Sequence, residues 1–129
     1  MVEVYIELSE DTLKNLLISS PSSVIVLKFS ASWCKPCQRI SKMVCDHFKN
    51  MPDNVIAFDL DIDQTCNQAL YSLFKKYRMV RGVPAILVFY GINKREHWFV
   101  PDLTVNNSNV NDINRLFSCV KDAANKIHA

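Results

Sequence analysis

Apolar runs that suit buried strands alternate along this chain with segments of helical periodicity. The runs at 24–29 (VIVLKF) and 85–90 (AILVFY) are rich in β-branched and aromatic residues, which is typical of strands covered on both faces. Between and around them, apolar residues recur three and four positions apart, as they do in amphipathic helices. Strands that alternate with helices predict an α/β architecture, in which helices cover both faces of one sheet.

The full pattern predicts the element order β-α-β-α-β-α-β-β-α. We expect strands at 2–8, 24–29, 55–63, 85–90 and 97–100, and helices at about 10–20, 36–51, 67–78 and 112–127. The polar, Asn-rich segment 101–111 is predicted to be a loop. The fold class is therefore α/β, with a mixed central sheet of about five strands flanked by about four helices. Because the chain shows no repeat and no linker, we expect a single domain over residues 1–129.

Bulk properties of the chain limit its partners. The net charge of +2 and the pI of about 8.3 fall short of the clustered positive charge that nucleic-acid or membrane binding needs. No apolar stretch approaches the ~18 residues of a membrane span, and the opening MVEVYIEL lacks the basic and apolar regions of a signal peptide. We therefore expect a cytoplasmic monomer that binds neither nucleic acid nor membrane and whose thiols are kept reduced.

Two cysteines stand where a predicted buried strand gives way to a helix, in the segment Trp33-Cys34-Lys35-Pro36-Cys37. Backbone N–H groups at a helix N-terminus stabilise an anion, so a thiol there carries more of the nucleophilic thiolate. Lys35 adds a positive charge nearby, and Pro36 is tolerated in a first helical turn because no N–H is needed there. We predict that Cys34, exposed at the tip, attacks a disulfide and that Cys37, one turn inside, resolves the mixed disulfide.

The alternative for this pair is a structural zinc site, which needs four ligands. Cys45, His47 and Cys66 are available, but none of them has the C-x-x-C or H-x₃-H spacing of zinc ligands. We therefore expect redox chemistry and no bound metal. Cys45, Cys66 and Cys119 are expected to be buried or incidental thiols. Cys66 is the best candidate among them for a regulatory thiol, because it follows a strand end among polar residues.

The segment from Phe29 to Gln38, FSASWCKPCQ, resembles the active-site segment of thioredoxins, especially the eukaryotic cytosolic form. A second element agrees, because Val83-Pro84 opens a later strand, where thioredoxins carry a cis-proline that faces the two cysteines. The resemblance covers roughly residues 3–125. It implies a thioredoxin fold, protein-disulfide oxidoreductase activity, and no bound cofactor beyond a redox-active Cys34–Cys37 disulfide.

Partners follow from the same resemblance. Trp33, Val83 and Pro84 would line an apolar patch for an extended segment of a protein disulfide substrate, and the main chain of Val83 would pair with that segment. Electrons would come from a thioredoxin-reductase-like flavoenzyme that uses NADPH.

The chain departs from the thioredoxin pattern at three positions near the cysteines. Lys35 stands where thioredoxins have glycine, and we expect its charge to make the couple more oxidising. Lys28 stands where they have a buried acid, which is thought to take the proton of the second cysteine. Asp59 stands where many bacterial members have a lysine that faces this acid. Since a lone buried charge is costly, we predict an inverted pair, Lys28 with Asp59, in which Asp59 or a nearby water serves the proton relay.

Two other functions remain open from the sequence. Some relatives of this fold act as binding or scaffold modules, and Lys28 could have weakened turnover in this chain. An oxidant or isomerase that works with a sulfhydryl oxidase is the other alternative, although the secretory version is disfavoured by the lack of a signal peptide.

Overall fold

The computed structural model describes residues 2–128; Met1 and Ala129, the ends of the predicted 1–129 domain, lie outside the described residues. The elements in chain order are β1 (Val4–Tyr5), α1 (Glu10–Ser19), β2 (Val24–Ser30), α2 (Lys35–Lys49), β3 (Val55–Asp61), α3 (Thr65–Lys76), β4 (Ala85–Tyr90), β5 (Leu103–Val105) and α4 (Val110–His128). Five strands and four helices confirm the predicted fold class.

The strands form one mixed sheet in the order β1-β3-β2-β4-β5. β1 and β2 both run parallel to β3, whereas β4 runs antiparallel to β2 and β5 antiparallel to β4. The central strand β2 therefore has neighbours on both sides along most of its length. Its first six residues are buried, as its continuous apolar run predicts.

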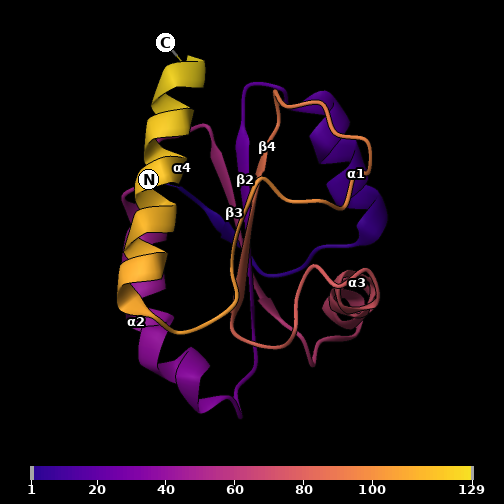
Figure 1. The fold of residues 1–129 in the computed structure, drawn as a ribbon, viewed down its shortest axis with the longest axis vertical. Coiled ribbons are helices and arrows are strands. Elements are labelled where there is room, and N and C mark those ends of the chain that lie inside the picture. The colour runs from indigo at the N-terminus through magenta and orange to yellow at the C-terminus, as the bar shows by residue number, and fades with distance from the viewer. Residues whose placement is uncertain (1, 129) are drawn as a thin grey trace.

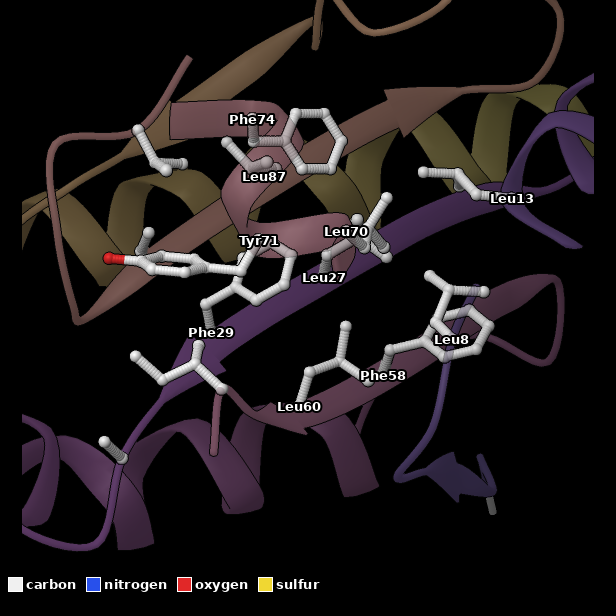
Figure 2. Packing of buried hydrophobic residues seen from close by; sticks show 14 of the residues in the cluster. Leu8, Leu13, Leu27, Phe29, Phe58, Leu60, Leu70, Tyr71, Phe74 and Leu87 are labelled. Carbon is white, nitrogen blue, oxygen red and sulfur yellow. The ribbon is translucent and has the colours of Figure 1, made fainter. Parts of the chain in front are cut away.

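Helices cover both faces of this sheet. α1 and α3 lie on one side and α2 and α4 on the other (Figure 1). Two separate apolar clusters fill the two interfaces. Figure 2 shows the first cluster, in which Phe29 of β2 points toward Tyr71 and Phe74 of α3, with ring centroids 5.4 and 5.9 Å apart. Both cysteines of the motif, Cys34 and Cys37, belong to this cluster.

The predicted strand at 2–8 is much shorter in the structure, where only Val4 and Tyr5 form β1. Apolar residues do alternate along 2–8, but after Tyr5 the main chain forms hydrogen bonds with a fully buried asparagine side chain and not with a neighbouring strand. Asn67 of α3 accepts a hydrogen bond from the Leu8 N–H at 3.0 Å and donates one to the Ile6 carbonyl at 2.9 Å. These bonds join residues about sixty positions apart, so no local pattern reveals them.

The predicted strand at 97–100 is wrong, and so is the prediction that 101–111 is entirely loop. Residues 97–100 instead pack as a loop, with Phe99 stacked on Tyr77 at a centroid distance of 4.1 Å. β5 forms later, at Leu103–Val105. It directly follows Asp102, whose carboxylate accepts a hydrogen bond from the Tyr90 N–H and forms an ion pair with Arg95. The aromatic side chains at 97–100 thus pack within a loop. The edge strand forms instead from Leu103–Val105, in which apolar and polar residues alternate.

Within residues 2–128, none of the helices has the length and the apolar character needed to cross a membrane.

Candidate active site

Cys34 is the N-cap of α2, in the turn that follows the central strand β2. Its Sγ accepts a hydrogen bond from the N–H of Cys37 at 3.2 Å, and Pro36 occupies the first turn. The sulfur therefore sits where the helix presents unpaired N–H groups and the positive end of its dipole. This placement is the one that the sequence predicts.

Cys34 and Cys37 form a disulfide, with Cα atoms 5.2 Å apart. The prediction that Cys34 is exposed is wrong for this oxidised form, because the residue is only 5% exposed and Cys37 only 3%. The Cys34 sulfur is enclosed because it bonds Cys37 on one side and lies 3.8 Å from the Val83 carbonyl oxygen on the other.

A loop before β4 lies against the disulfide. The Val83–Pro84 peptide bond is cis, Pro84 is buried, and Val83 is partly exposed. The Val83 carbonyl faces Cys34, so the structure brings this predicted substrate-contacting residue next to the predicted nucleophile.

Trp33, the third predicted substrate-contacting residue, is 64% exposed. Its indole Nε1–H donates a hydrogen bond to Asp63 Oδ2 at 3.0 Å. Asp63 follows β3, and its own N–H bonds to Asp61 Oδ1 at 2.9 Å. Sequence reasoning missed this role for Asp63, although its position just after the end of a strand beside the motif was a usable signal.

Lys28 and Asp59 form the predicted pair, with Nζ and Oδ1 3.7 Å apart. They are direct neighbours in register on the parallel strands β2 and β3. The pair is asymmetric, since the Lys28 side chain is 3% exposed and that of Asp59 is 43% exposed. The acid therefore links a buried cation to solvent.

A polar cavity of about 420 Å³ lies beside this pair. Lys28, Asp59 and Cys37 all line it, together with hydroxyl groups of Ser30 and Ser41. Cys34 is not among the lining residues. The structure thus puts the ion pair on the side of Cys37 and away from the Val83 loop.

The remaining predicted residues are Lys35 and three further cysteines. Lys35 is exposed at the start of α2. Cys45, Cys66 and Cys119 are free thiols and all three are exposed, so of the predicted alternatives, buried or incidental, only the incidental one remains. Cys66 Sγ lies 3.4 Å from Asn67 Oδ1. Among the residues that the structure describes, no group of three or more His, Cys, Asp or Glu side chains is placed to share a metal ion.

Comparison with known proteins identifies the family. The profile of the Thioredoxin family matches residues 4–100. The chain belongs to the thioredoxin family. A curated relative, thioredoxin 3 of Plasmodium falciparum, is 30% identical over 125 residues, which cover 93% of this chain and 62% of the relative. The chain thus spans less than two thirds of that relative's length. A thioredoxin of Buchnera aphidicola is 32% identical over 69% of this chain and 75% of its own length.

Solved structures of thioredoxins have the same fold as this family member. A crystal structure of a Plasmodium falciparum thioredoxin superimposes with a TM-score of 0.64 at 29% identity, covering 93% of this chain and 90% of the other. Thioredoxin O1 of Arabidopsis thaliana in its oxidised state gives a TM-score of 0.68 over 92% and 97% of the two chains. Family membership and the Cys34–Cys37 disulfide together support the predicted thiol–disulfide oxidoreductase chemistry.

Proposed function

We propose that this protein is a thiol–disulfide oxidoreductase that reduces or exchanges disulfides of protein substrates by cycling Cys34 and Cys37 between dithiol and disulfide. The observation that carries the proposal is the position of this disulfide. It caps a helix N-terminus and lies against the Val83 main chain, so one sulfur has both an activating environment and a surface where a substrate segment can dock.

The proposed reaction has two steps. In the reduced protein, the Cys34 thiolate attacks one sulfur of a substrate disulfide, the substrate S–S bond breaks, and the second substrate sulfur leaves as a thiolate that takes up a proton. Cys37 then loses its proton and attacks Cys34 Sγ, which breaks the mixed disulfide and releases the substrate sulfur that Cys34 had attacked, as a thiolate that takes up a proton. The substrate gains two electrons and two protons, and the protein keeps the Cys34–Cys37 disulfide.

Cys34 is the proposed nucleophile because its sulfur is the one stabilised by the helix. The N-cap position and the Cys37 N–H at 3.2 Å favour negative charge on Cys34 Sγ. Lys35, the next residue, adds positive charge at the exposed end of the helix. Cys37 lies one turn inside and is the proposed resolving residue.

Lys28 and Asp59 are the proposed proton path for Cys37. Both line the cavity that Cys37 lines, and the partly exposed Asp59 reaches water. Asp59, or a water beside it, takes the Cys37 proton when Cys37 attacks, and the positive charge of Lys28 favours the thiolate that remains. The inverted pair would thus serve a step for which thioredoxins use a buried acid.

Trp33, Val83 and Pro84 are the proposed substrate surface. An exposed indole held by Asp63 presents a rigid apolar face, and the cis-Pro84 loop offers main-chain groups to an extended segment. Acting in the cytoplasm as a monomer, the protein would receive electrons from a thioredoxin-reductase-like flavoenzyme, and its own chain would bind no cofactor.

Insulin reduction by dithiothreitol tests the proposal, because turbidity reports the reduced insulin chains. The protein should accelerate the reaction, and Cys34→Ser should return it to the uncatalysed rate. Cys119→Ser is the matched control, since it removes an exposed free thiol far along the chain, and it should keep full activity. A Cys34→Ser rate equal to that of the wild-type protein would instead favour a binding module.

A further inference from the structure

One side chain from beyond β5 holds the loop that carries the substrate surface. Asn106 directly follows β5, which pairs with β4, so it lies beside the residues that lead into β4. The Arg81 N–H donates a hydrogen bond to Asn106 Oδ1 at 2.6 Å. Asn106 Nδ2 donates to the Gly82 carbonyl at 3.0 Å and to the Pro84 carbonyl at 2.9 Å. The side-chain amide of Asn106 thus forms hydrogen bonds with three main-chain groups of the four-residue loop Arg81–Pro84.

This bonding pattern requires a side-chain amide. An amide offers one acceptor oxygen and two N–H donors at its end, whereas a carboxylate has no donor and a hydroxyl has only one. The partners of Asn106 are one N–H and two carbonyls, so each end of the amide faces the complementary group. Asn106 is partly buried, which makes an unmade bond costly for the two carbonyls.

Asn106 forms hydrogen bonds with the residues before and after Val83 in the chain and none with Val83 itself. These bonds engage Gly82 and Pro84, the neighbours of Val83 in the chain, but not its own N–H or carbonyl. The Val83 carbonyl faces the Cys34 sulfur at 3.8 Å. The asparagine therefore fixes the backbone on both sides of Val83 in the chain and leaves the Val83 carbonyl toward the disulfide.

We propose that Asn106 is a positioning residue for substrate docking, which holds the Val83 main chain in the orientation that an extended substrate segment needs beside Cys34. The inference rests on the proposed function, because it concerns docking at the same disulfide. A loop fixed before binding loses less conformational freedom when the substrate arrives, so the effect belongs to affinity for a protein substrate. A small disulfide that needs only the Cys34 sulfur gains nothing from the fixed loop.

Kinetics on two substrates test this inference. Asn106→Ala should raise KM for insulin about fivefold through the loss of preorganisation. It should leave kcat close to the wild-type value, and likewise the single-turnover rate at which the pre-reduced protein, freed of dithiothreitol, reduces 5,5′-dithiobis(2-nitrobenzoic acid), a small disulfide. Asn107→Ala is the matched control, because the Asn107 side chain bonds to Asp112 and to the Asn109 N–H and not to the loop. It should behave as wild type with both substrates.

Asn106→Ser is the second variant, to be used if Asn106→Ala does not fold. Its hydroxyl keeps one donor, so KM for insulin should fall between the values for wild type and alanine. A wild-type protein inactive with both substrates would contradict the proposed function. An active wild type with unchanged KM for insulin in the folded variants would overturn only the role of Asn106. Equal losses with both substrates would also overturn it, since Asn106 would then act on the cysteines or on the fold.

Discussion

The residues around Cys34 and those around Cys37 differ in chemical character. On the Cys34 side lie the exposed Trp33 and the Val83 loop, which are the proposed docking surface for a substrate segment. On the Cys37 side, a polar cavity contains the buried Lys28 and the partly exposed Asp59. The Cys34 side is therefore suited to binding a segment of a protein substrate, and the Cys37 side is suited to proton transfer.

Two of the three departures from the thioredoxin pattern, Lys28 and Asp59, lie on the Cys37 side, and the third is Lys35, next to Cys34. The tryptophan, the cysteines and the cis-proline stand in their expected places, whereas the charges next to Cys37 are inverted. Neighbouring register positions on two parallel strands make such an inversion feasible, because the two side chains meet whichever strand carries the acid. In the proposed mechanism, substrate docking and proton transfer therefore depend on different residues of one fold.

The largest expected effect concerns the stability of the polar side. Asp59→Asn leaves Lys28 as a buried charge without a counter-ion. Breaking a fully buried pair costs ~3–5 kcal/mol, and because Asp59 is 43% exposed we expect a loss of about 2 kcal/mol in the free energy of unfolding. Urea denaturation of the oxidised protein measures it.

Asp46→Asn is the matched control, because it removes the acid of the exposed pair Lys42–Asp46 on the surface of α2. Exposed pairs contribute little, so its denaturation midpoint should stay near that of the wild type. Equal losses in the two variants would show that Lys28 does not depend on Asp59.

The next effect separates the two steps of the reaction. Lys28→Met should slow the release of substrate from the mixed disulfide about tenfold, a modest part of what acid–base assistance supplies, and should leave the attack by Cys34 unchanged. Acid-quenched samples analysed by intact mass give both rates. If both steps slowed equally, the ion pair would serve the whole centre and not Cys37 alone.

Much of this arrangement could be predicted from the sequence, because it depends on local patterns. The β2 run, the helix start at the cysteines and the proline before β4 are each marked by neighbouring residues. The pairing of Lys28 with Asp59 was also predictable, since a buried lysine needs an acid. The burial of Cys34 was not predictable, because it depends on the Val83 loop that packs against it from a distant part of the chain.

Two features that the sequence does not reveal share one physical cause, which is hydrogen bonding between an asparagine side chain and distant main chain. Asn67 replaces the sheet as the partner of Ile6 and Leu8 and so shortens β1. Asn106 holds the Arg81–Pro84 loop in the same manner. Asparagine is strongly polar and so indicates an exposed position in a hydropathy pattern, whereas Asn67 is fully buried. The partners of both asparagines are set only by the folded topology, so periodicity cannot find these contacts.

A smaller effect tests the apolar side. Trp33→Ala should raise KM for insulin about threefold, because an exposed aromatic anchor contributes a modest part of docking affinity. The reaction with a small aromatic disulfide, followed by absorbance, should change less than the insulin reaction. A fall in kcat at constant KM would place Trp33 in the chemical step and would contradict its proposed role in substrate docking alone.

The smallest expected effect concerns the redox potential. Lys35→Gly removes a positive charge next to Cys34 and so disfavours the reduced, anionic form. We expect a potential about 15 mV more reducing, which is about threefold in the equilibrium constant. Equilibration with glutathione buffers measures it, and Lys49→Ala, at the far end of α2, should leave the potential unchanged. A more oxidising potential in Lys35→Gly would contradict this role of the charge.

Capture of the covalent intermediate tests most directly whether the two cysteines have separate tasks. Reduced Cys37→Ser, mixed with insulin, should accumulate a disulfide-linked adduct, and peptide mass spectrometry should locate the link at Cys34. Cys34→Ser under the same conditions should give no comparable adduct. A link at Cys45, Cys66 or Cys119, or equal adducts in the two variants, would contradict the assignment of Cys34 as the attacking residue.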